Sequence, residues 1–188
     1  MWISLLSKPK VPEYVIHQYC WQYFPDIPEG EPRPFLYRVL GESMLMLSRL
    51  KPATSTAVNI ADRIECGKVY QFDLLANPAR GGTITIDGVK RRVHRRVYST
   101  NEELRAWIHR RFEDGGADIT FVQSFKRPTR RIRKGDGNIV TVCDVVFRGT
   151  LMVKDLSAFK RKMLAGIGGR GAWGCGLLVL PEIMTFSK

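Results

Sequence analysis

The sequence predicts an α+β protein made of two tandem ferredoxin-like (RRM-like) βαββαβ domains. Three observations support this fold class. Strand-like and helix-like segments follow one another in the order β-α-β-β-α-β, and the same order begins again at Lys68. The 188 residues are 44% hydrophobic, which is enough for a sizeable core in one domain or two small ones. We expect the domains to span residues 1–66 and 67–188.

Proline, glycine and the spacing of apolar residues define the elements of the first domain. Pro12 suits the first turn of a helix, and the four prolines between Pro25 and Pro34 mark a loop. Gly41-Glu42 marks the turn of a hairpin. The expected elements are a strand at 2–7, a helix at 13–24, hairpin strands at 35–40 and 44–50, a short helix at 55–61 and the end of a closing strand at 64–66.

The second domain repeats this order with longer insertions. A long basic connection precedes its first helix, a basic hairpin tip separates its two middle strands, and a glycine-rich loop joins its last helix to its last strand. The expected elements are a strand at 69–75, a helix at 101–112, strands at 119–125 and 140–153, a helix at 156–165 and a strand at 177–180.

Charge is divided unevenly between the two domains. Residues 1–66 carry 7 basic and 7 acidic side chains, whereas residues 67–188 carry 23 and 11, so the whole net charge of +12 belongs to the second domain. Several basic runs in one domain favour a polyanionic partner. Nucleic acid is favoured over an anionic membrane, because the chain has no basic amphipathic helix with a broad apolar face and no apolar run near the ~20 residues that span a bilayer.

Cysteine spacing and the N-terminal segment indicate the compartment. Cys20, Cys66, Cys143 and Cys175 are far apart and lack the spacing of a zinc site. The apolar segment at 2–6 is too short for the core of a signal peptide. We therefore expect free thiols, no metal, no cofactor and a cytoplasmic protein.

Two basic clusters supply the expected nucleic-acid contacts of the second domain. Arginine is favoured in such clusters because its planar fork grips phosphate in two places. A cluster of this kind more often holds phosphates than reads sequence. The expected contacts are Lys90, Arg91, Arg92, Arg95 and Arg96 in the connection, and Arg127, Arg130, Arg131, Arg133 and Lys134 at the hairpin tip.

Residues 166–176 contain six glycines and lead into the apolar strand at 177–180. A segment that loses this much backbone entropy on folding usually needs positive φ or close approach of another backbone. A nucleotide P-loop is disfavoured, since no Gly-Lys-Ser/Thr ending is present. A tight helix-to-strand connection would explain two or three glycines, whereas six predict a loop that cradles phosphate. The expected contacts there are Lys160, Gly168, Gly169, Arg170 and Gly171.

Four motifs follow one another along nearly the whole chain. They are Tyr14-Val15-Ile16-His17-Gln18 followed by Trp21 and Phe24-Pro25, then Leu75-Ala76-Asn77-Pro78, then Gly135-Asp136-Gly137 before Thr141-Val142-Cys143, and finally the glycine loop ending in Gly174-Cys175-Gly176-Leu177-Leu178. Together they resemble the CasE family, the endoribonucleases that cut CRISPR precursor RNA within its repeat stem-loops in type I-E or related systems. The resemblance implies the same tandem fold, a repeat stem-loop as RNA partner and other subunits of a CRISPR effector complex.

Tyr14 and His17 are the candidate catalytic residues. On a helix they are three residues apart, so they are neighbours on the side away from the apolar face. A lone histidine is usually structural or merely exposed, but the resemblance places the family's catalytic histidine and tyrosine at these positions. The rivals, His94 and His109, lie among arginines and are expected to be surface or RNA-contact residues.

The absence of paired carboxylates or histidine clusters gives metal-assisted hydrolysis little to work with. RNA carries its own nucleophile, because the ribose 2′-OH attacks the adjacent phosphorus when a base takes its proton and an acid protonates the 5′ leaving oxygen. His17 suits either role near neutral pH, and Tyr14 can orient the hydroxyl or the imidazole. The products would be a 2′,3′-cyclic phosphate and a 5′-hydroxyl.

The sequence therefore predicts a metal-independent endoribonuclease that cleaves CRISPR precursor RNA at repeat stem-loops and stays bound to the mature guide RNA. One alternative is a non-catalytic RNA-hairpin-binding subunit on the same fold. A generic basic RNA-binding or ribosome-associated protein is a more distant one, because nothing in that function requires the glycine loop.

Overall fold

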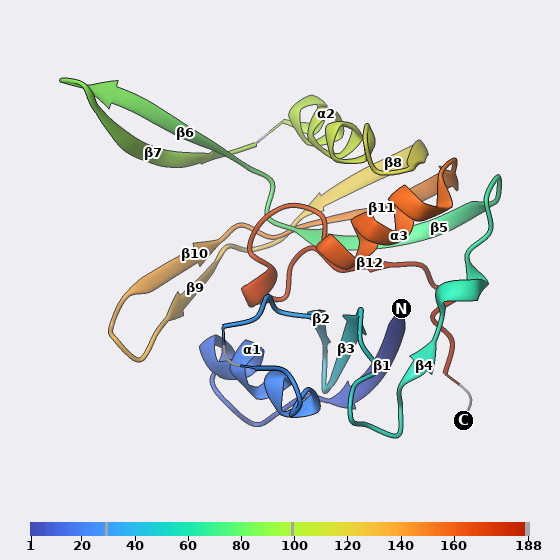
Figure 1. The fold of residues 1–188 in the computed structure, drawn as a ribbon. Helices are drawn as coiled ribbons and strands as arrows, with labels where there is room; N and C mark the ends of the chain where they lie inside the picture. Colours follow the sequence, from blue (N-terminus) through green and yellow to red (C-terminus); the bar gives the residue numbers. More distant parts are fainter. Residues whose placement is uncertain (29, 99, 187–188) are drawn as a thin grey trace.

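Two four-stranded antiparallel sheets form the body of the protein. Figure 1 shows them in a computed structural model that describes residues 1–28, 30–98 and 100–186, without the side chains of 80–86 and 90–97. The strand orders are β2-β3-β1-β4 in the first sheet and β12-β5-β11-β8 in the second. When the strands of each sheet are renumbered 1 to 4 in chain order (β1, β2, β3, β4 and β5, β8, β11, β12), both strand orders read 2-3-1-4 or its reverse. This is the strand order of a ferredoxin-like sheet. The predicted fold class is confirmed.

The first unit contains one sheet, one helical segment at residues 13–23 and a short 3-10 turn after its last strand. Its elements are β1 (Trp2–Ser7), η1 (Glu13–Val15), α1 (Ile16–Tyr19), η2 (Cys20–Tyr23), β2 (Phe35–Leu40), β3 (Ser43–Ser48), β4 (Val58–Asn59) and η3 (Ala61–Arg63). The helix expected at 13–24 is thus a 3-10 turn, one α-helical turn and a second 3-10 turn. Its β-branched and aromatic residues have modest helix propensity, so packing of the buried Ile16 and Cys20 holds the segment in place.

Two predictions at the end of the first unit are wrong. Residues 55–61 do not form a helix, and residues 64–66 are not a strand. The Thr54 hydroxyl accepts a hydrogen bond from the Thr56 amide at 3.4 Å, a local bond that competes with a helical turn. The chain then pairs Val58 with Ile3, so β4 is the closing strand. The expected domain boundary after residue 66 falls between β4 and β5 and stays a prediction.

The second unit carries two inserted hairpins. Its elements are β5 (Val69–Ala76), β6 (Ala79–Ile86), β7 (Val89–Val97), α2 (Asn101–Phe112), β8 (Ala117–Lys126), β9 (Arg130–Arg133), β10 (Ile139–Val142), β11 (Val145–Val153), α3 (Leu156–Ala165), η4 (Gly171–Trp173) and β12 (Leu178–Val179). Both long helices have side-chain caps: Thr100 and Glu103 form a capping box at α2, and Asp155 caps α3. Both helices are confirmed at the predicted bounds.

The basic segments differ from the sequence prediction in three ways. The long basic connection is the β6–β7 hairpin. Most of the basic run at 126–134 is not a hairpin tip, because it comprises the end of β8, a short link and all of β9. Only its last residue, Lys134, belongs to the tip, which spans Lys134–Asn138. The strand expected at 140–153 is interrupted at Cys143–Asp144, which divides it into β10 and β11. Both hairpins extend from the second unit, and β9–β10 lies beside the helical segment of the first (Figure 1).

A common core joins the two units. Leu45 and Leu47 of β3 belong to the same buried cluster as Leu74 of β5, Phe147 of β11 and Met163 of α3. The catalytic candidates of the first unit are therefore held at a fixed distance from the hairpin and the glycine loop of the second.

Candidate active site

Tyr14 and His17 lie where the two units meet. Tyr14 is in η1 and His17 is in α1, one turn further along. Tyr14 packs against a buried cluster of the second unit that includes Ile132 of β9 and Trp173 of the glycine loop. Its hydroxyl is so close to the β9–β10 tip that a Cβ added to Gly135 would lie 3.3 Å from it. The first unit thus supplies the candidate catalytic side chains, and the second unit supplies residues that pack against them.

His17 is half-buried and mainly neutral. Its ring lies 6.5 Å from the Trp173 ring, centroid to centroid. Burial lowers the pKa of His17, the positive charges of Arg33 and Lys134 lower it further, and the Tyr14 backbone partly opposes them. The buried Nδ1 has no hydrogen-bond partner of good geometry among the described residues. A pKa below the usual 6.5 leaves the imidazole neutral at pH 7, so it can accept a proton there.

Arg33 is a site residue that the sequence analysis missed. It comes from the proline-rich loop, and its guanidinium lies 5.4 Å from the centre of the Phe35 ring. A Cβ added to Gly171 would lie only 2.6 Å from its Nη2 atom, so the guanidinium rests on the glycine loop. Burial lowers the pKa of Arg33. One arginine in a loop with no neighbouring basic residue gives no pattern, so only the fold could reveal its position.

Contacts within the protein account for most glycines of the loop. Gly166, Gly174 and Gly176 have φ of 81°, 77° and 94°, in the left-handed region that disfavours side chains. At Gly168, with φ of 88°, a Cβ would also meet the Trp107 ring at 2.9 Å. Gly171 makes room for Arg33. We expected a tight helix-to-strand connection to explain two or three of the six glycines, but contacts and backbone angles within the protein explain five. The number of glycines therefore no longer indicates a loop that cradles phosphate.

Arg170 is the unusual residue of this loop. It has φ of 70°, which is rare outside glycine, and its Nε is buried without an acceptor among the residues described. Such strain is found at functional sites when the surrounding structure enforces it. A phosphate contact by Arg170 therefore stays a prediction with some geometric support.

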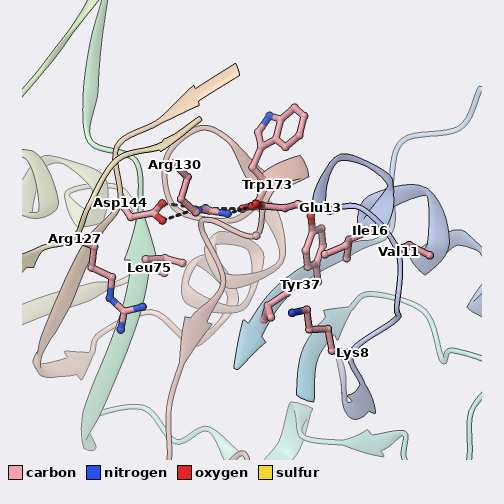
Figure 2. A pocket seen from close by; sticks show the side chains of 12 residues that line it. Lys8, Val11, Glu13, Ile16, Tyr37, Leu75, Arg127, Arg130, Asp144 and Trp173 are labelled. Atoms are coloured by element: carbon pink, nitrogen blue, oxygen red, sulfur yellow. Dashed lines mark hydrogen bonds and ion pairs between the residues drawn. The ribbon is translucent and has the colours of Figure 1, made fainter. Parts of the chain in front are cut away.

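Arg130 occupies a network inside the protein. Its guanidinium binds Asp144 through Nε–Oδ2 at 2.5 Å and Nη2–Oδ1 at 3.0 Å, donates to the Trp173 carbonyl at 3.0 Å and pairs with Glu13 (Figure 2). Burial would lower the Arg130 pKa, but Asp144 outweighs it and raises the pKa. Burial and Asp144 also raise the pKa of the Cys175 thiol to about 12. Arg130 thus joins η1, the break between β10 and β11, and the glycine loop. Most of its donors are used within the protein, and its expected role as a phosphate contact stays a prediction.

A pocket of about 330 Å³ opens beside this network, between the two units. Lys8 and Arg127 lie on the same side of the Arg130 network, and the Trp173 indole points away from the guanidinium (Figure 2). The pocket is lined by Lys8, Val11, Glu13, Ile16, Tyr37, Val39, Leu75, Arg127, Arg130, Asp144, Trp173 and Gly174.

The remaining predicted contacts are dispersed. Arg131 and Arg133 are exposed on β9, on the face opposite the buried Ile132, and Lys134 is near enough to act on the His17 pKa. Lys160 lies near the amino group of Met1. Burial lowers the pKa of this amino group most, and the charge of Lys160 lowers it further. The side chains of Lys90, Arg91, Arg92, Arg95 and Arg96, and of His94, lie outside the described part of the chain, although their backbone forms β7.

Other catalytic arrangements find little support in the structure. His109 is exposed on α2, where it lines a shallow hollow with Thr120 and Phe121. Among the described residues, no group of three or more histidine, cysteine, aspartate or glutamate side chains could hold a metal ion. In the same part of the chain, no helix has the length and apolar character needed to cross a membrane.

The fold and the site define a basic protein of two ferredoxin-like units, with a tyrosine–histidine pair between a hairpin and a glycine loop. Comparison with family models identifies it further: the model described as "CRISPR associated protein" matches residues 8–181. The chain belongs to this family of CRISPR-associated proteins, and the predicted resemblance to the CasE family is confirmed. Comparison with curated proteins finds no match.

Solved structures agree over nearly the whole chain. The CRISPR-associated protein Cas6e from Escherichia coli K-12 has a TM-score of 0.74 and 26% identity, covering 96% of this chain and 98% of that one. Thermus thermophilus Cse3, bound to an RNA representing a pre-cleavage complex, has a TM-score of 0.69 and 22% identity, covering 95% and 97%. A chain of E. coli Cascade bound to a PAM-containing double-stranded DNA target has a TM-score of 0.59 and 23% identity, covering 96% and 98%. The last two support the fold alone.

Proposed function

We propose that this protein is an endoribonuclease that cleaves CRISPR precursor RNA at repeat stem-loops and then stays bound to the mature guide RNA. The observation that carries the proposal is the position of Tyr14 and His17 between the two units, in a fold shared with Cas6e over 96% of the chain. A related structure is described as the CRISPR endoribonuclease Cse3 bound to a 19-nucleotide RNA. Another is a chain of Cascade, so we propose a cytoplasmic effector complex with further subunits as the setting.

Cleavage would use the 2′-OH of the RNA as nucleophile. Because burial and neighbouring cations lower the His17 pKa, the imidazole is neutral at pH 7 and suited to take the 2′-OH proton. The same ring, once protonated, suits the acid role toward the 5′ leaving oxygen. Tyr14 would orient the reacting groups. The products would be a 2′,3′-cyclic phosphate and a 5′-hydroxyl, with no metal or cofactor required.

The RNA stem would lie against the basic face of the second unit. Arg131 and Arg133 point out from β9, and Arg127 follows β8, so all three are exposed beside the catalytic helix. We propose that these residues hold phosphates together with Lys134, the β7 cluster, Lys160 and the loop at Gly168–Gly171. Arg130 is not included, because its donors are used within the protein.

A non-catalytic RNA-hairpin-binding subunit remains the second candidate function. One observation favours it: among the described residues no hydrogen bond of good geometry holds the Nδ1 atom of His17, although the Tyr14 backbone is close enough to raise its pKa. In many catalytic histidines a bond at one nitrogen fixes the tautomer that the other nitrogen needs. In this alternative His17 would contact RNA without moving a proton.

Cleavage of a radiolabelled repeat stem-loop by the wild type and His17→Ala separates the two candidates. We expect the variant to cut about 10²-fold to 10⁴-fold more slowly, the range that general acid–base groups supply. Its affinity for RNA should stay close to that of the wild type. Both reactions are run with excess EDTA, which should leave the wild-type rate unchanged. Equal cutting by the variant would exclude His17 as the proton carrier, and an uncut RNA with the wild type would favour the binding subunit.

A further inference from the structure

The Arg33 guanidinium is a half-buried cation that has no counterion among the described residues. In the part of the chain that the structure describes, no carboxylate lies within 4.0 Å of it. Its contacts are the face of the Phe35 ring and the backbone at Gly171. Removing a charge from water without a partner is costly, so the position suits an anion that is bound only part of the time.

Arg33 lies on the side of His17 that faces the glycine loop. Gly171, on which the guanidinium rests, is two residues before Trp173, whose ring is the neighbour of the His17 ring. The charge of Arg33 acts on His17 and on Cys20, which is one helical turn further along. Three elements therefore converge here: the proline-rich loop, the catalytic helix and the glycine loop.

Two other cations near the site, Lys134 and Arg130, are already paired. Lys134, which also acts on His17, lies 3.7 Å from the Asp136 carboxylate. Arg130 is bound to Asp144 and Glu13. Arg33 alone among these three has its donors free for a ligand, as far as the described residues show. Arginine presents them as a planar fork that matches two oxygens of a phosphate.

We propose that Arg33 binds the scissile phosphate of the RNA and neutralises the negative charge that develops on it during cleavage. This inference rests on the proposed function. The 2′-oxygen forms a bond to phosphorus as its proton leaves to a base, and the bond from phosphorus to the 5′-oxygen then breaks as that oxygen takes up a proton. The guanidinium transfers no proton; it donates hydrogen bonds to the non-bridging oxygens, whose charge is greatest in the transition state.

Gly171 has a role in this arrangement that does not depend on backbone strain. Unlike Gly168 and Gly174, it does not have positive φ. A methyl group at this position would occupy the space of the Arg33 guanidinium, which could move away because it is the end of a flexible side chain. Gly171→Ala should therefore displace Arg33 while the fold is kept.

The main test compares Arg33→Gln, Arg33→Lys and Arg49→Gln in single-turnover cleavage of a repeat stem-loop at saturating protein. Arg49 is a matched control, because it is an exposed arginine whose amide binds Pro34, next to Arg33. We expect Arg33→Gln to slow cleavage about 10²-fold to 10³-fold, as for the loss of one donor to a developing charge. Arg33→Lys should recover part of the rate, since it keeps the charge without the fork. The control should cut like the wild type.

Binding of an RNA with one 2′-deoxy sugar at the cleavage site measures the ground state. Arg33→Gln should weaken this binding by about tenfold or less, so that the main loss is in the rate constant. Gly171→Ala should slow cleavage in the same direction. Rates within about threefold of the wild type for both variants would overturn the inference.

A second measurement separates a phosphate ligand from a merely structural residue. NMR titration of the three histidines in the free protein should show the His17 pKa rising in Arg33→Gln, because a neighbouring cation has been removed, and staying constant in Arg49→Gln. An unchanged His17 pKa would place Arg33 too far away and overturn the inference. If the wild type cuts, His17→Ala does not and Arg33→Gln cuts normally, only the inference fails. If the wild type leaves the RNA uncut, the proposed function and the inference fail together.

Discussion

Replacing Arg130 tests whether this arginine holds the two units together or contacts RNA. Arg130→Ala would leave the Asp144 carboxylate, whose side chain is 6% exposed, without its cation. Breaking a buried ion pair costs about 3 to 5 kcal/mol, and because the Arg130 side chain is 31% exposed we expect the lower end, about 3 kcal/mol. For a chain of this size that corresponds to a fall in Tm of about 6 to 12 °C.

The assay is urea unfolding of Arg130→Ala beside Arg131→Ala, its exposed neighbour. Arg131→Ala should change the free energy of unfolding by about 0.5 kcal/mol or less. The double variant Arg130→Met, Asp144→Leu should recover stability relative to Arg130→Ala, because it removes the unpaired charge as well. The reasoning is refuted if Arg130→Ala is no less stable to urea than Arg131→Ala. A lower salt dependence of RNA binding by Arg130→Ala, without a loss of stability, would show that Arg130 contacts RNA.

Three further predictions concern pH, salt and the glycine loop. With His17 as the base, kcat/KM should rise with pH through a value below 6.5 and be level at neutral pH, because protonation below the lowered pKa removes the base; a rise centred at or above 6.5 would contradict the effect of burial and Arg33. Arg131→Ala with Arg133→Ala should lower the slope of log affinity against log salt by about 1 for each lost phosphate contact, and an unchanged slope would remove β9 from the RNA interface. Gly168→Ala should lower Tm by several degrees, since it combines positive φ with a 2.9 Å approach to Trp107, and an unchanged Tm would mean that the loop can adapt.

The elements that sequence analysis predicted well are those with local signals. Thr100 and Glu103 mark the start of α2, and Asp155 marks the start of α3, so both helices could be bounded from a few residues. The β6–β7 hairpin had such a signal and was nevertheless missed. Asp87-Gly88 follows an alternating segment, and both residues have positive φ, as a two-residue hairpin turn requires.

The parts that could not be predicted depend on contacts between distant residues. The interruption between β10 and β11 places Asp144 against Arg130 and Cys175, which no local pattern reveals. Arg130 and Arg131 are adjacent and look equivalent in sequence, yet one binds inside the protein and the other is exposed. Tyr14 and His17 could be proposed from the sequence because they share one helical turn and match the motif of the CasE family. Arg33 could be proposed only when the fold brought its loop against Gly171.

The most direct test of the account is cleavage of a repeat stem-loop that carries a single 2′-deoxy sugar just 5′ of the scissile phosphate. With EDTA present, we predict that the wild-type protein binds this RNA as tightly as the all-ribose RNA and does not cut it. The all-ribose RNA should yield a 2′,3′-cyclic phosphate and a 5′-hydroxyl under the same conditions. Cutting of the deoxy substrate at the rate of the ribose one would show that the 2′-OH is not the nucleophile, and the roles proposed for His17, Tyr14 and Arg33 would be contradicted with it.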